Sequence, residues 1–143
     1  MAAAQLDASA GAGGLSQWQS FTAEVGGGLS SISIQLSSPL GTRPGSGTLE
    51  VFEGEGPKGN RIVSTSVEIA PVAFAEVQEF AFDELVPIAG GRVYSWQLTI
   101  DEQNIGFLSI NTNNPYEAGR FSSGDEDDAV FRVDVVSCIP DPP

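Results

Sequence analysis

Apolar and polar residues alternate one by one along several short stretches of this chain, which is the spacing of side chains on the two faces of a β-strand. The clearest stretch places Tyr94, Trp96, Leu98 and Ile100 on one face. Further inward positions are predicted at Phe21, Ala23 and Val25; Ile32, Ile34 and Leu36; Leu49 and Val51; Val63, Thr65, Val67 and Ile69; Phe80 and Phe82; Leu108 and Ile110; and Phe131, Val133 and Val135. The chain therefore predicts about eight short strands.

Clusters of glycine, proline and polar residues separate these stretches, as turns do. The longest such clusters span residues 37–47 and 111–124. A helix over Pro71–Glu79 is the one helical alternative, and its propensity is weak. Many short strands with regular turn signals are typical of an antiparallel β-sandwich, most simply a jelly roll. The predicted fold class is thus all-β.

The length of 143 residues fits one domain. Residues 1–15 are small and polar and predict an N-terminal arm that is flexible or docked on a partner. Residues 16–137 hold the sandwich, and residues 138–143 form a Pro-rich tail. The first residues have neither the basic nor the apolar region of a secretory signal, so we expect a signal already removed or another route of export.

The chain is strongly acidic and contains no histidine. Six basic residues against 19 acidic ones give a formal net charge of −13, which repels phosphate backbones and anionic lipids. We therefore expect no nucleic-acid and no membrane partner. The absence of histidine removes the usual general base and the usual transition-metal ligand. The single cysteine, Cys138, predicts an inert thiol or an intermolecular disulfide.

A series of strings across residues 17–136 carries a family resemblance. The strings are "QSFTA", "LSSISIQL", "GTLEVFEGEGPKGNRIVST", "EFAF", "VPIAGGRVYSWQLT", "NTNNPYEAG" and "DDAVFRVDV". In this order they resemble a recurrent jelly-roll-like module of secreted bacterial proteins and of phage tail or virion proteins. The resemblance implies a non-catalytic domain used for display, adhesion or glycan contact, working outside the cell or on a virion surface.

The densest acidic segment suggests calcium. Asp125, Asp127 and Asp128 precede the last strand, and hard oxygen ligands of this kind suit Ca²⁺. The segment is not an EF-hand, because the positions that require glycine and a bidentate glutamate are both valine. A structural calcium site could combine these aspartates with a distant residue such as Glu24. The alternative is a solvated acidic turn.

A sugar-binding platform needs flat rings exposed beside amide or carboxylate groups. Tyr94 and Trp96 share a face with Leu98, so we expect them in the core. Trp18 and Tyr116 are the better candidates for exposed rings, with Asn113 and Asn114 as amide partners. The alternative is that these rings pack over their own loops.

Signs of catalysis are weak, and we predict that the chain is not an enzyme. A Ser-His arrangement is impossible without histidine, and there is no nucleophile elbow. The Gly54-Glu55-Gly56 segment lacks the lysine, serine or threonine of a phosphate loop. Near the end of the chain, Arg132 and Asp134 predict an ordinary cross-strand ion pair.

Assembly accounts for features that the other interpretations leave unused. An extended arm of small residues can add a strand to the sheet edge of a partner. We therefore expect a non-catalytic structural or assembly module displayed on a surface, such as a virion decoration (cement) or appendage subunit, that forms a homo-oligomer through its arm and sheet edges. The alternative is a glycan-binding or adhesion module of a secreted bacterial protein.

Overall fold

The computed structural model describes residues 2–5, 10–12, 16–37, 45–70, 75–100, 107–111, 119 and 128–136, and every regular element in these ranges is a β-strand. The strands are β1 (Ala3–Gln5), β2 (Ala10–Ala12), β3 (Ser16–Thr22), β4 (Gly27–Ser37), β5 (Gly45–Glu53), β6 (Arg61–Ile69), β7 (Ala75–Ile88), β8 (Val93–Ile100), β9 (Phe107–Asn111), β10 (Asp128–Ala129) and β11 (Phe131–Val136). The eight strands with five or more residues correspond to the eight predicted ones. The all-β prediction is confirmed.

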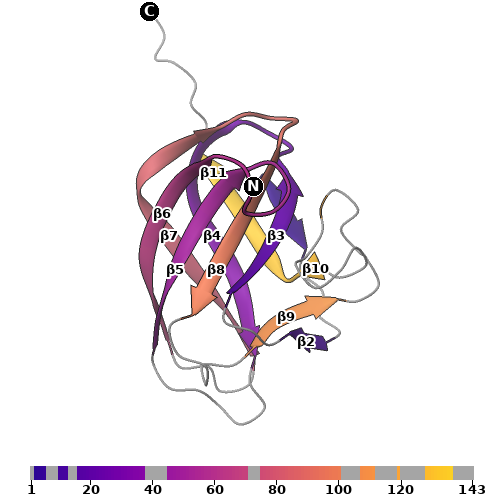
Figure 1. The fold of residues 1–143 in the computed structure, drawn as a ribbon, viewed down its shortest axis with the longest axis vertical. Helices are drawn as coiled ribbons and strands as arrows, with labels where there is room; N and C mark the ends of the chain where they lie inside the picture. The colour runs from indigo at the N-terminus through magenta and orange to yellow at the C-terminus, as the bar shows by residue number, and fades with distance from the viewer. Residues whose placement is uncertain are drawn as a thin grey trace, which may run out of the picture.

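The order of strand pairing shows how the sandwich is wound (Figure 1). β5 and β6 form the hairpin at the tip, and the flanking strands pair outward in turn: β4 with β7, β3 with β8, and β1 with β11. Rolling this long hairpin over itself adds the pairs β4–β11 and β5–β8. Two antiparallel sheets result, a first sheet β1-β11-β4-β7 and a second sheet β3-β8-β5-β6. This winding is that of a jelly roll.

A small extension continues the first sheet beyond β4. β9 pairs with the last residues of β4, and β2 and β10 both pair with β9. Figure 1 shows these three short strands beside the main sandwich. The extension therefore ties segments from both halves of the chain to the same sheet.

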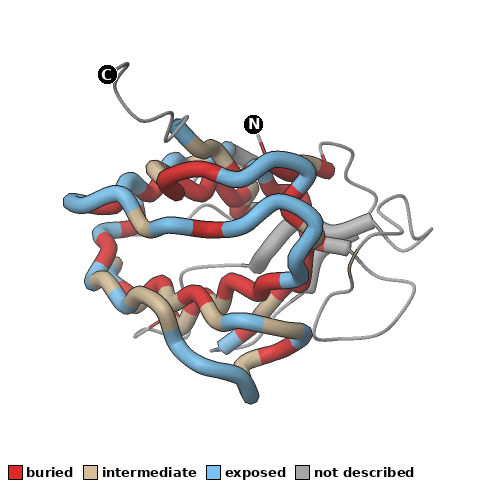
Figure 2. Tube along the Cα trace, turned by 90° about the horizontal axis from the view of Figure 1, so that it is seen from above, coloured by how far each residue is buried: buried red, intermediate tan, exposed pale blue. Residues whose placement is uncertain are grey.

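The core lies between the two sheets. Buried residues alternate with more exposed ones along β5, and Figure 2 shows such changes of burial along the chain. Its largest fully enclosed side chains, each at most 1% exposed, include Phe21, Leu29, Ile32, Ile34, Leu36, Leu49, Trp96, Leu98 and Phe131. Three ring pairs bridge the sheets or neighbouring strands at centroid distances of 6.0–6.3 Å, namely Phe21–Tyr94, Phe21–Phe131 and Trp96–Phe131. Such distances fit favourable tilted contacts. The prediction that Tyr94 and Trp96 lie in the core is confirmed.

The predicted inward position of Val25 is wrong. β3 ends at Thr22, and the chain then turns, so that the alternation stops before Val25. Ala23 is still buried, whereas Val25 is 49% exposed. A turn changes the direction of successive side chains, and the period of two cannot be extended across it.

The structure divides the N-terminal arm predicted over residues 1–15. Ala3–Gln5 forms β1 and pairs with β11 of the same chain, and Ala2 donates a backbone hydrogen bond to the Val133 carbonyl at 2.7 Å. Ala2 and Ala3 are fully buried. Small side chains let this strand lie close over the core, so it docks on its own domain rather than projecting from it.

The segment considered for a helix contains the start of β7. Residues 75–79 are strand and pair with Ser33–Ser37 of β4. Pairing within the sheet overrides a weak local preference, and the helical alternative is wrong for these residues; Pro71–Phe74 lie outside the described residues. The described residues contain no helix that is long and apolar enough to cross a bilayer.

Candidate functional site

Most of the predicted calcium and glycan residues fall outside the described part of the chain. Asp125, Asp127, Asn113, Asn114 and Tyr116 belong to segments that the structure does not describe. Their predicted roles stay predictions.

Hydrogen bonds connect the backbones of Glu24 and of Ala129, the residue after Asp128, to opposite ends of β1. The Glu24 N–H donates to the Ala2 carbonyl at 2.9 Å. Asp128 belongs to β10, and the carbonyl of the next residue, Ala129, accepts a hydrogen bond from Gln5 Nε2 at 3.0 Å. Ala2 and Gln5 are three residues apart, which is about 10 Å along a strand. The side chain of Asp128 lies outside the described residues, so the calcium site stays a prediction.

Trp18 covers a turn of its own sheet. A Cβ built on Gly56, in the β5–β6 turn, would meet Cζ2 of the Trp18 indole at 3.4 Å, so the ring lies against this glycine. Ser95, which is fully buried, holds the same turn: its Oγ accepts from the Gly56 N–H at 2.7 Å and donates to the Gly54 carbonyl at 2.8 Å. Trp18 is therefore half-buried on the outer face of the second sheet.

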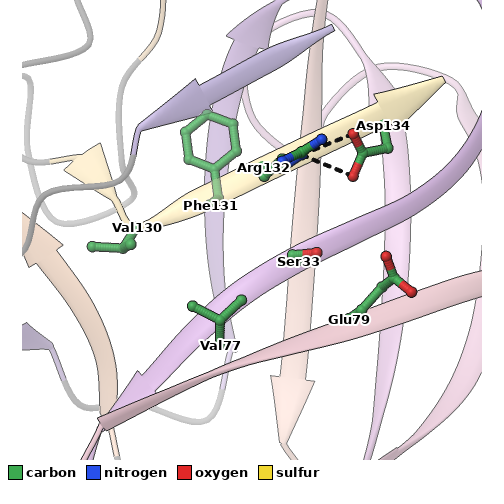
Figure 3. Close-up of a pocket in the computed structure, with 7 residues that line it drawn as sticks. All are labelled: Ser33, Val77, Glu79, Val130, Phe131, Arg132 and Asp134. Atoms are coloured by element: carbon green, nitrogen blue, oxygen red, sulfur yellow. Dashed lines mark hydrogen bonds and ion pairs between the residues drawn. The ribbon is translucent and has the colours of Figure 1, made fainter. Parts of the chain in front are cut away.

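On the outer face of the first sheet, polar side chains from three neighbouring strands form a row (Figure 3). Pairing places Arg132 of β11 opposite Ser33 of β4, and Ser33 opposite Glu79 of β7. The residues face outward because their neighbours Phe131, Ile32 and Phe80 point into the core. The row crosses the sheet at right angles to the strands.

This row lies in an open groove of about 420 Å³, here called the Arg132 groove. Its lining residues are Ser33, Val77, Glu79, Val130, Phe131, Arg132 and Asp134. Val77 is 59% exposed and gives the groove an apolar wall, whereas the Phe131 ring belongs to the core and is 1% exposed. The described lining therefore offers no exposed aromatic ring for a sugar to stack on.

Arg132 and Asp134 form an ion pair along β11. The Arg132 Nε–H donates to both carboxylate oxygens of Asp134, at 2.9 and 3.1 Å. The prediction of a cross-strand ion pair is wrong: the pair lies within one strand, because residues two apart share a face of the sheet. Only Nε is used, so the terminal guanidinium N–H groups of this half-exposed side chain have no partner among the described residues.

Glu79 provides a second carboxylate on the far side of the row. Its Oε2 accepts a long hydrogen bond of 3.4 Å from Ser31 Oγ. The groove thus places the guanidinium donors of Arg132, two carboxylate acceptors and one exposed aliphatic side chain on strands that are fixed by pairing. Such a mixture suits hydrogen bonding to a polar surface with apolar contact beside it.

Sequence reasoning found Arg132 and Asp134 but missed Ser33, Val77 and Glu79. The alternation predicts the outward positions of β4 and β7, but it does not predict that these strands pair. Ser33 and Glu79, which pair, are more than 40 residues apart along the chain. Comparison with protein-family models, with curated protein sequences and with solved structures found no match to this chain.

Proposed function

We propose that this jelly roll is a non-catalytic structural module that binds a neighbouring protein subunit through the Arg132 groove, as a virion decoration or appendage subunit at an exposed surface does. The Arg132 guanidinium, whose terminal N–H groups have no partner among the described residues, carries the proposal. Arginine is enriched where proteins meet, since one planar group donates several hydrogen bonds and also packs against apolar atoms.

The chemistry of the groove favours a protein over a sugar. Val77 is a large aliphatic side chain in open solvent, beside charges of both signs. A protein surface can cover the valine and pair with Arg132, Asp134 and Glu79 at once. The neighbouring subunit is a copy of this chain or another component of the same particle.

Glycan binding is the second candidate. The carboxylates of Glu79 and Asp134 and the donors of Arg132 are groups that hydrogen-bond sugar hydroxyls. It is weaker for this groove because ring stacking has no described partner there, and Trp18 lies on the other sheet.

Sedimentation velocity over a wide range of protein concentration, together with a glycan array, tests the proposal. We expect concentration-dependent association, weakened by Val77→Asp and by Arg132→Ala, and no signal on the array. Glu55→Ala, in the exposed β5–β6 turn, is the control. A monomer at every concentration that binds a glycan, with Arg132→Ala abolishing that binding, would overturn assembly in favour of the second candidate.

A further inference from the structure

One edge of the second sheet is open to pairing. β6 is the last strand of that sheet, and its only described ladder is with β5. From Val63 to Ile69 this ladder runs without a bulge, and the segment contains no proline, glycine or lysine. A groove of about 500 Å³ lies beside residues 62–65, between β6 and residues 82–87 of β7. An edge strand that is long, regular and nearly uncharged is a template for another strand.

The other described edges are protected. β7 departs from its ladder at Phe82–Leu85, where four residues stand opposite the single Ser30 of β4, and it carries the exposed acids Glu79, Asp83 and Glu84. β1 is only three residues long. β3, at the opposite edge of the second sheet, has four of its seven residues buried. Bulges, charges, short length and burial are the usual ways in which proteins block an edge. Over Val63–Ile69, β6 has no bulge and carries a single charge, that of Glu68.

A bulge at one end of β6 gives its outer face a particular order of side chains. Val51 pairs with Val63 but Phe52 pairs with Arg61, so Ile62 is an extra residue. Because of the extra residue, Arg61 shares the outer face with Ser64, Ser66 and Glu68, and its Nη1 reaches Glu50 Oε2 of the same face at 2.9 Å. The outer row therefore begins with a positive charge, continues with two serines and ends with a negative charge. When a second copy of the strand runs antiparallel, the positive end of each strand lies beside the negative end of the other.

We propose that two copies of this domain pair through β6, antiparallel, with Thr65 on the two-fold axis. This register places Glu68 beside Arg61 of the other copy and Ser64 beside Ser66 of the other copy. On the inner face, Val63 lies beside Val67 of the other copy, and the two Thr65 residues meet. Opposite charges, threonine pairs and β-branched pairs are all favourable cross-strand neighbours. The two second sheets become one continuous sheet of eight strands.

The charged groups at this edge are available for such a contact. The Arg61 side chain is 58% exposed and uses only Nη1 within the chain, so its remaining N–H groups have no partner among the described residues. Glu68 is exposed and makes no described side-chain contact. The complementarity selects a second copy as the occupant of the edge, since the same strand supplies both charges in mirrored order. This inference rests on the proposed assembly function and names one contact surface of it.

Charge reversal tests the register. Glu68→Arg places two arginines together at each end of the pair, and Arg61→Glu places two glutamates together. We expect each variant alone to have half the wild-type solution mass by light scattering, with a dissociation constant raised by about tenfold or more. An equal mixture of the two variants restores the wild-type mass. In a dimer of one copy of each variant, both arginines of the Glu68→Arg copy lie beside glutamates of the Arg61→Glu copy. Measurements are made with a reductant, so that Cys138 cannot link the chains.

Controls separate loss of pairing from loss of fold. Arg92→Glu makes the same change of charge as Arg61→Glu at an exposed site outside β6, in the turn before β8, and should leave the mass unchanged. If Arg61→Glu unfolds because its carboxylate faces Glu50, the double variant Glu50→Gln/Arg61→Glu replaces it. Circular dichroism checks the fold of each.

The outcomes distinguish the two proposals. Masses halved in each single variant and restored in the mixture establish the β6 pairing. A wild-type oligomer that both single variants retain overturns the β6 pairing but leaves the assembly function standing through another surface. A wild-type chain that is monomeric at every concentration and binds glycans on the array overturns both.

Discussion

The two tryptophans occupy opposite situations, and their removal should have different costs. Trp96 is fully buried, packs 6.0 Å from the Phe131 ring, and makes no described hydrogen bond through Nε1. Trp96→Ala leaves a large cavity, and we expect the free energy of unfolding to fall by about 3–5 kcal/mol. Trp18 is half-buried over Gly56, so Trp18→Ala should cost about half as much or less. Urea unfolding measures both; equal losses would mean that Trp18 is as enclosed as Trp96.

Gln19 joins two distant parts of the chain through one buried amide. Its Oε1 accepts from the Ala129 N–H at 2.7 Å, and its Nε2 donates to the Ser20 carbonyl at 2.9 Å. Gln19→Leu leaves the Ala129 N–H without its acceptor in a site closed to water. We expect a loss of about 1–3 kcal/mol in the free energy of unfolding. Gln97→Leu on β8 is the matched control, since Gln97 is only half-buried, and it should cost far less.

At the scale of elements, β1 is the first strand of the jelly roll, and its docking can be tested by a pair of variants. Ala3 is fully buried, whereas Ala4 is half-buried. Ala3→Lys forces a charged side chain into the core and should detach β1, so that hydrogen exchange of the β11 amides paired with it becomes at least about tenfold faster. Ala4→Lys should leave that exchange nearly unchanged. Equal protection in both variants would show that β1 does not shield β11.

The docking of β1 also changes how the ends of the chain can be used in experiments. Removing residues 1–14 would take away two sheet strands, β1 and β2, and two buried alanines together with any surface for a partner. A truncated chain that fails to assemble would therefore not distinguish a lost contact from a lost strand. The charge-reversal variants on β6 avoid this, because they alter exposed side chains alone.

At the scale of the whole molecule, the net charge of −13 opposes both folding and association. Two described ion pairs, Arg61–Glu50 and Arg132–Asp134, act in the other direction but are exposed to solvent. Raising NaCl from low to physiological strength shortens the Debye length to about 8 Å and screens the repulsion. We expect the unfolding temperature to rise by about 3 °C or more. Potassium chloride should act equally; a fall in the unfolding temperature would mean that the ion pairs outweigh the repulsion.

The strands and the fold class follow from the local pattern of apolar and polar residues. A period of two is imposed by the geometry of extended backbone, so Tyr94, Trp96 and Leu98 had to share a face, and burial follows from their size and apolarity. The same local rule failed where backbone geometry changes, at Val25 after the end of β3. Alternation identifies the face of a strand only as far as the strand runs without interruption.

Which strands are neighbours depends instead on how the whole chain packs, and the candidate surfaces depend on these neighbours. Ser33 and Glu79 meet Arg132 because β4 lies between β7 and β11. Likewise, β6 lies at the edge of the second sheet, and β1 pairs with β11 of its own chain, because of how the long hairpin rolls up. Pairing between strands that are distant in the chain is set by the packing of the whole core, in which many residues act together, whereas the alternation along one strand is a local property.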